Sequence, residues 1–209
     1  MDEIDAPAAF PYRPVSPARR GRKRFLCAAG TVLALAAAAF LGRWAVNAAL
    51  AGPGDAGRYR LAPPASFQGL TRQETGPRVD AIKRGQGTPK PGTTPVAVVY
   101  ADPAGTAQLV VSGAAGAFTD EDPGHVLVRG LHDTGADGTA PQDAGTPAGG
   151  AMQCGTLASG AGPVTLCMWA DHSSVVTVTV PVEHAPVPIG TLAGRVRALR
   201  AAMEVPAAS

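Results

Sequence analysis

A charge-free apolar run near the N-terminus constrains this chain more than any other feature. Residues 25–41 read FLCAAGTVLALAAAAFL and contain no charged side chain. A helix of this length spans about 25 Å, close to the ~30 Å hydrocarbon core of a bilayer. Arg43 can extend its charge to the headgroups and Trp44 favours the interface, so the helix can continue to Leu50. Apolar residues occupy every face, which favours a transmembrane helix over residues 25–50 and not a buried core helix.

Basic residues directly before this run orient the predicted helix. The cluster ARRGRKR occupies residues 18–24, and basic residues stay on the cytoplasmic side of a membrane span. We therefore expect residues 1–24 to form a disordered cytoplasmic tail, and the C-terminal part to lie outside the cytoplasm. The net charge is only +2, and all of the basic excess lies in this tail because the rest of the chain is slightly acidic, so no nucleic-acid-binding surface is predicted. The lipid bilayer is the predicted partner of the N-terminal region.

A cleaved signal peptide is the alternative to an uncleaved anchor. Ala49-Leu50-Ala51 before Gly52 fits the small-x-small pattern of a cleavage site. Arg43 interrupts the stretch before that site, and the tail before the run is long for a signal peptide, so we favour the anchor. Both interpretations place the remainder of the chain in the same compartment.

The remainder divides into a linker and a small core. With 26 glycines, 20 prolines and 5% aromatic residues, the packed core should be smaller than the 209 residues suggest. Residues 51–93 are predicted to be an extracytoplasmic linker and docking segment, with docking around Phe67 and Leu70 and a short helix over 76–85. Residues 94–204 are predicted to form the globular domain. Within it, 133–150 has no large apolar residue and is predicted to be a mobile loop.

Residue periodicity predicts the elements of this domain. Its β-branched and alternating segments predict strands at 95–101, 107–113, 151–157, 163–170 and 173–180. Residues 120–135 fit a helix with acids at its start, although Gly130 weakens that prediction. The clearest amphipathic helix lies at the C-terminus, with its apolar stripe at Ile189, Leu192, Val196, Leu199 and Met203.

Three arginines lie off this C-terminal stripe. Arg195, Arg197 and Arg200 are therefore expected to face solvent. The predicted fold class is α+β: an N-terminal transmembrane helix followed by a small two-layer domain. That domain would hold an antiparallel sheet of about five strands with the C-terminal helix packed on it.

Two cysteines follow the membrane run and sit on neighbouring predicted strands. Outside the cytoplasm thiols oxidise, and Cys154 and Cys167 form an even set around a Gly-rich turn. We predict a disulfide that closes a short loop. A zinc site is disfavoured because the spacing lacks a Cys-x-x-Cys pair and only His172 is near, while two free thiols are a further alternative.

The residues after the second cysteine are candidates for binding. Strand alternation puts Cys167, Trp169 and Asp171 on one face, so Trp169 is expected to pack over the disulfide, or else to be an exposed aromatic at a binding site. Asp171, His172 and two serines contain the residue types of a hydrolase triad. Adjacent residues do not converge as triad members must, so no catalytic residue is predicted here.

The stretch CGTLASGAGPVTLCMWAD, residues 154–171, resembles a Cys-Gly…Cys-x-Trp-Ala-Asp signature. A group of uncharacterised actinobacterial single-pass membrane proteins carries it. LAPPASFQGLTRQ, residues 61–73, is similar to the Pro-then-Gly-Leu entry segment of that group, and the likeness covers about residues 20–204. The resemblance implies a basic tail, one membrane helix and an extracytoplasmic domain with the disulfide. The group continues with a Gly-bearing turn where this chain has SSVV, and it carries no activity to transfer.

The predicted function is a non-catalytic extracytoplasmic domain that interacts with or senses an envelope protein or ligand. Trp169, Asp171 and His172 are its candidate binding residues, and no cofactor or metal site is predicted. The alternative is an anchored or secreted hydrolase of the cell envelope. A pocket with converging titratable residues would favour the enzyme, whereas a groove without them would favour the binding module.

Overall fold

The structure is a computed structural model that describes residues 54–119 and 122–208. These residues belong to one compact unit, Ala51–Ser209. The predicted cytoplasmic tail, 1–24, and the predicted transmembrane helix, 25–50, lie outside the described residues. Among the described helices, none has the length and apolarity that a membrane span needs.

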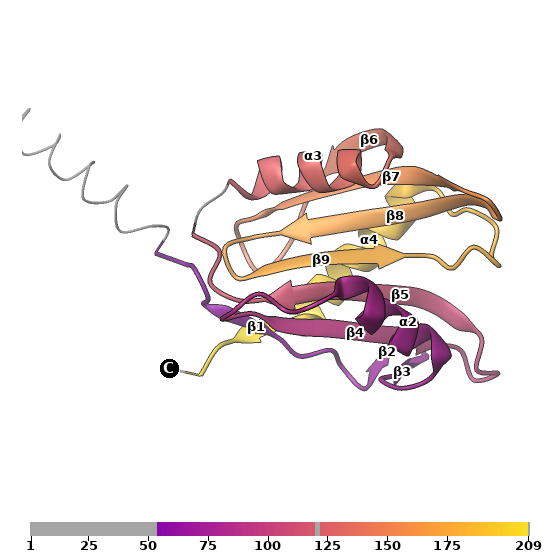
Figure 1. Ribbon diagram of the computed structural model, residues 1–209, viewed down its shortest axis with the longest axis horizontal. Helices are drawn as coiled ribbons and strands as arrows, with labels where there is room; N and C mark the ends of the chain where they lie inside the picture. Colours follow the sequence, from indigo (N-terminus) through magenta and orange to yellow (C-terminus); the bar gives the residue numbers. More distant parts are fainter. Residues whose placement is uncertain (1–53, 120–121, 209) are drawn as a thin grey trace, which may run out of the picture. The chain divides into compact units, whose positions relative to one another are not determined.

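An eight-stranded antiparallel sheet dominates the described unit (Figure 1), with strand order β2-β3-β4-β5-β9-β8-β7-β6. Its strands are β2 (Ser66–Phe67), β3 (Leu70–Gln73), β4 (Thr94–Ala101), β5 (Ala107–Ala115), β6 (Ala136–Gln142), β7 (Ala151–Ser159), β8 (Gly162–Ala170) and β9 (Ser174–Thr179). A separate two-stranded sheet pairs β1 (Tyr59–Leu61) with β10 (Glu204–Pro206). The α+β class and the antiparallel sheet are confirmed, but the prediction of about five strands is wrong.

The strands that were not predicted are short or polar. β2 and β3 have two and four residues, too few for a period-two pattern. β6 reads ADGTAPQ, which has no large apolar residue, and among the described strands it lies at the edge of the sheet and pairs with β7 alone. The predicted loop over 133–150 is therefore wrong for 136–142, because backbone pairing with β7 forms a strand there without apolar side chains.

Helices cover both faces of the sheet. On one face lies α4 (Ile189–Met203), and on the other lie α2 (Pro77–Gln86) and α3 (Pro123–Asp133). The largest core lies under α4, and two smaller clusters lie under α2 and α3. The domain therefore has three layers where the sequence predicted two. All three helices were predicted, and the buried stripe of α4 is confirmed.

The segment before β4 belongs to the fold and is not a linker. Phe67 and Leu70 are buried, and the Phe67 ring meets the Tyr100 ring edge to face at 5.9 Å. The Tyr100 hydroxyl donates to the Pro64 carbonyl at 3.0 Å, and burial raises the pKa of this phenol to about 12. Docking around Phe67 and Leu70 is confirmed, whereas the predicted start of the domain at residue 94 is too late.

Replacing Phe67 by Ala tests this extension of the core. We expect the Phe67→Ala variant to lose about 3 kcal/mol of unfolding free energy, because the change leaves a cavity against Tyr100. The matched control is Val128→Ala on α3, since Val128 is 54% exposed and its truncation should change stability by less than about 0.5 kcal/mol. Denaturant unfolding measures both. A loss of similar size in the two variants would contradict the placement of Phe67.

Candidate functional site

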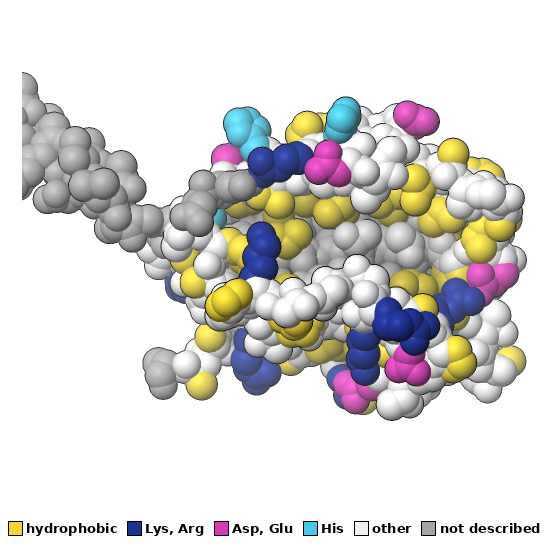
Figure 2. All heavy atoms as spheres, in the orientation of Figure 1, with side chains coloured by type: hydrophobic (Ala, Val, Ile, Leu, Met, Phe, Trp, Pro, Cys, Tyr) yellow, Lys and Arg dark blue, Asp and Glu magenta, His cyan; other side chains and the backbone are white. Residues whose placement is uncertain are grey.

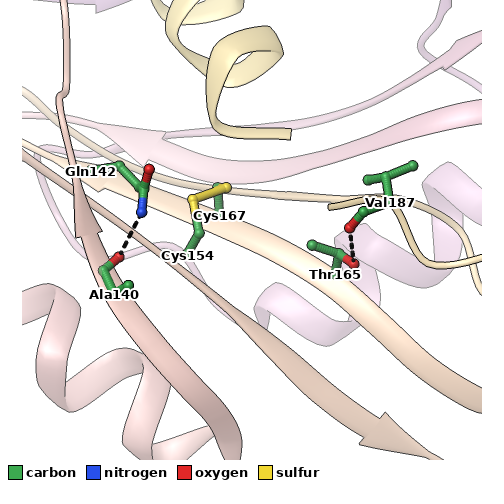
Figure 3. Close-up of a disulfide and its surroundings, with 6 residues drawn as sticks. All are labelled: Ala140, Gln142, Cys154, Thr165, Cys167 and Val187. Atoms are coloured by element: carbon green, nitrogen blue, oxygen red, sulfur yellow. Dashed lines mark hydrogen bonds between the residues drawn. A yellow bond between two sulfur atoms is a disulfide. The ribbon is translucent and has the colours of Figure 1, made fainter. Parts of the chain in front are cut away.

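Cys154 and Cys167 are joined by a disulfide between adjacent strands (Figure 3). They stand directly opposite each other in the β7–β8 register, and their Cα atoms are 4.0 Å apart. Both are fully buried in the core under α4. The predicted disulfide is confirmed, and its two sulfurs are bonded to each other and so cannot ligate zinc.

Trp169 is fully buried in the same core cluster as the disulfide. Its indole N–H donates to Ser174 Oγ at 3.1 Å and to Glu204 Oε1 at 2.7 Å. The Ser174 hydroxyl also donates to Glu204. The expected packing beside the disulfide is therefore observed, and the ring has no exposed surface to offer a ligand.

Asp171 organises the turn between β8 and β9. Its Oδ1 accepts from the backbone N–H of Ser173 at 2.6 Å and of Ser174 at 2.7 Å. Its Oδ2 lies 2.9 Å from Arg200 Nη2. Both carboxylate oxygens are therefore engaged inside the protein.

Arg200 is fully buried, so the prediction that it faces solvent is wrong. Its Nε donates to Glu204 Oε2 at 2.9 Å, and its other nitrogens donate to Asp171 and to the carbonyls of Ala144 and Gly149. A guanidinium offers five donors, and these partners compensate its removal from water. The position of Arg200 beside the apolar stripe did not indicate its burial, because the acids that pair with it lie outside the helix. Asp171 lies in the β8–β9 turn and Glu204 lies at the start of β10. Arg197, by contrast, is partly exposed and pairs with Asp143 at 3.0 Å.

His172 and Ser173 hold the segment through which the chain enters the domain, which we call the entry segment (residues 54–58). His172 Nδ1 lies 2.9 Å from Asp55 Oδ1, and the His172 carbonyl accepts from the Gly57 N–H at 3.0 Å. The Ser173 hydroxyl donates to the Asp55 carbonyl at 3.1 Å. The turn 171–174 therefore fastens the entry segment to the sheet.

These contacts do not assemble a hydrolase triad. His172 pairs with Asp55, Asp171 pairs with Arg200, and the two serine hydroxyls bind the entry segment and Glu204. A triad requires the histidine to take the proton of the serine hydroxyl, and within the described residues His172 is directed elsewhere. Asp171, His172, Ser173 and Ser174 are therefore each engaged in a separate contact, and their side chains do not converge.

A groove lies between α2 and α3 on the sheet face opposite α4, and we call it the interhelical groove. Figure 2 shows the hollow between the two helices, and its volume is about 870 Å³. Its floor comes from β5 and β9, with Ser112, Ala114, Val175 and Thr177. Its walls include most of the segment 86–95, Phe118 and the start of α3. It exists because α2 packs mainly on β4 and α3 packs mainly on β7 and β8, which leaves parts of β5 and β9 between the helices uncovered.

Sequence reasoning missed this groove. The available signal was the alternation of small and hydroxyl side chains at Ser112, Ala114 and Thr177, on the face that the helices leave open. Three ionisable side chains are among its described lining residues, namely Lys90, Arg129 and Asp171. Of the predicted binding residues Trp169, Asp171 and His172, Asp171 is the one that lines the groove. Trp169 lies on the other face of the sheet, in the core under α4.

No protein-family model, curated protein or solved structure matches this chain.

Removing the disulfide should destabilise the domain substantially. We expect the Cys154→Ser/Cys167→Ser variant to lose about 2–5 kcal/mol, the usual range for small secreted domains, and each single variant to lose a similar amount. Thiol counting after denaturation, with urea unfolding beside it, checks both points. Reducing the parent should bring its stability toward that of the double variant. Two titratable thiols in protein from an oxidising compartment would contradict the bond.

Glu204 should give the stability a distinctive pH dependence. Burial raises the pKa of this carboxyl, and the charge of Asp171 adds to the effect, although hydrogen bonds and Arg200 oppose it. Because a raised pKa means that the folded state binds this proton more tightly than the unfolded chain does, Glu204 contributes most to stability below its ordinary pKa of 4.5. This stabilisation is lost as the pH rises through the raised pKa.

The Glu204→Gln variant removes this titration. We expect the stability of the parent relative to the variant to fall as the pH rises above the ordinary carboxyl pKa of 4.5, by about 1.4 kcal/mol for each unit of pKa elevation. Glu183→Gln is the control, because a hydrogen bond to its own backbone N–H and Arg78 lower the pKa of Glu183. Urea unfolding across this pH range measures the effect. A constant difference between parent and Glu204→Gln would rule out the raised pKa.

Proposed function

We propose that this chain is a single-pass membrane protein that presents a non-catalytic extracytoplasmic binding domain, with the interhelical groove as its binding surface. The anchor rests on the apolar run and the basic cluster that precedes it. The described unit adds a buried disulfide, which fits an oxidising compartment. The resemblance to actinobacterial membrane proteins supports the same topology.

One observation carries the non-catalytic part of the proposal. The groove is concave, but its described ionisable residues are two cations and Asp171, whose oxygens are already engaged by Arg200 and backbone N–H groups. General acid–base catalysis needs titratable groups that converge on a substrate, and this lining offers no such pair. A lining of small apolar, proline and hydroxyl side chains is suited to holding a ligand by shape and hydrogen bonds. The envelope hydrolase remains the alternative function.

One membrane preparation tests both parts. With the full chain expressed, a C-terminal reporter should be active outside the cytoplasm, and the protein should remain in the membrane fraction after a carbonate wash. Release of a shorter species starting near Gly52 would contradict the anchor. The same preparation is treated with a fluorophosphonate probe for reactive serines, and no labelling is expected. Labelling that disappears in Ser173→Ala or Ser174→Ala would support the hydrolase instead.

A further inference from the structure

Two rows of side chains that run across the strands form the floor of the interhelical groove (Figure 2). The first row is apolar, and the strand register places its members side by side on β4, β5, β9 and β8: Pro95, Ala114, Val175 and Ala170. Neighbouring strands lie ~5 Å apart, so this row is about 14 Å wide. The second row lies two residues away along β5 and places Ser112 opposite Thr177. An apolar strip and a pair of hydroxyls therefore lie next to each other on the floor.

The two helices cover both ends of the second row and leave its hydroxyls open. The register continues this row from Ser112 to Ala97 on β4, and from Thr177 to Met168 on β8. Ala97 belongs to the cluster under α2, and Met168 belongs to the cluster under α3. A ligand that enters between the helices would therefore meet the hydroxyl pair directly.

Hydroxyls in the groove have hydrogen-bonding capacity to spare. Gln86 Nε2 donates to Ser112 Oγ at 3.1 Å, so this oxygen accepts a hydrogen bond while its own hydrogen is available to donate. Within the part of the chain that the structure describes, the hydroxyls of Thr88 and Thr177 have no protein partner. Each of them can both donate and accept. The lining is therefore suited to a ligand that itself carries hydroxyl groups.

Most ionised side chains of the described lining are already engaged inside the protein. The oxygens of Asp171 bind Arg200 and two backbone N–H groups, and Arg129 also has an interaction partner within the chain. Lys90 is the other ionisable residue of the described lining, and it is exposed in the wall. Hydroxyls and apolar surface are therefore the main means of recognition that this lining offers.

An extended peptide cannot join the floor as an additional strand. β5 pairs with β4 and β9, and β9 pairs with β5 and β8, so both floor strands have a partner on each side. Strand addition requires an exposed sheet edge. A ligand in the groove must therefore be held by side chains.

We propose that the interhelical groove binds a neutral oligosaccharide of the cell envelope. A sugar ring carries hydroxyl groups around its edge and C–H groups on its faces, so it can bond to Ser112 and Thr177 while it covers the apolar row. The groove volume of about 870 Å³ lies within the range of small-molecule sites. The ligand is assigned to the groove of the proposed function and so depends on that function.

The test uses the full chain in phosphatidylcholine nanodiscs, which carry no sugar. Saturation-transfer NMR titrations measure its affinity for cellotetraose and for the tetramer of N-acetylglucosamine, and we expect at least one to bind. Thr177→Val should weaken binding about fivefold, the effect of one lost hydrogen bond. Thr179→Val should leave the affinity unchanged, because it is the same substitution on the same face of β9 but Thr179 is not among the groove residues.

Three results would overturn the proposal. These are the absence of binding by both tetrasaccharides, an unchanged affinity in Thr177→Val, or binding by the deacetylated, cationic tetramer of glucosamine alone. The third result would assign the groove to a charged ligand. Shortening of either tetrasaccharide, which mass spectrometry detects, would instead overturn the non-catalytic function and leave sugar binding in place.

Discussion

A fully buried arginine is the interaction on which the rest of this structure depends. Arg200 has lost its hydration, and a desolvated guanidinium costs several kcal/mol unless charge and hydrogen bonds replace the water. Asp171 and Glu204 supply the charge, and the carbonyls of Ala144 and Gly149 supply two further acceptors. These partners come from the β8–β9 turn, the start of β10 and the loop before β7. One side chain therefore determines how four segments meet.

The interhelical groove, which we propose as the binding surface, depends on this arrangement indirectly. Asp171 can cap the turn 171–174 because Arg200 holds its second oxygen. The turn in turn presents the His172 carbonyl, which aligns the entry segment with the groove wall at Phe118. The disulfide fixes β7 to β8 within the same core. The groove itself needs few specialised residues, because its position follows from where α2 and α3 leave the sheet uncovered.

The features that could be predicted from the sequence are those that follow from residue periodicity or from neighbouring residues in the chain. The stripe of α4 follows from residue spacing, and the disulfide follows from compartment and strand pairing. β6 could not be predicted, because its stability comes from hydrogen bonds to β7 and not from its own side chains. The burial of Arg200 could not be predicted either: Glu204 is a local partner four residues on, but Asp171, the other acid, is 29 residues away in the chain. The groove depends on where the helices lie on the sheet. Its one sequence signal is weak: small and hydroxyl side chains on β5 and β9.

The pairing of β1 with β10 has a mechanical consequence. The first strand of the described unit is hydrogen-bonded to the last, and the Ala207 N–H donates to the Arg58 carbonyl at 2.8 Å. A pulling force on the chain ahead of residue 54 would load these few hydrogen bonds and the contacts of the turn 171–174 first. It would reach the eight-stranded sheet only afterwards. Tension along the polypeptide would thus detach the entry segment from the groove end while the disulfide-linked core stayed folded.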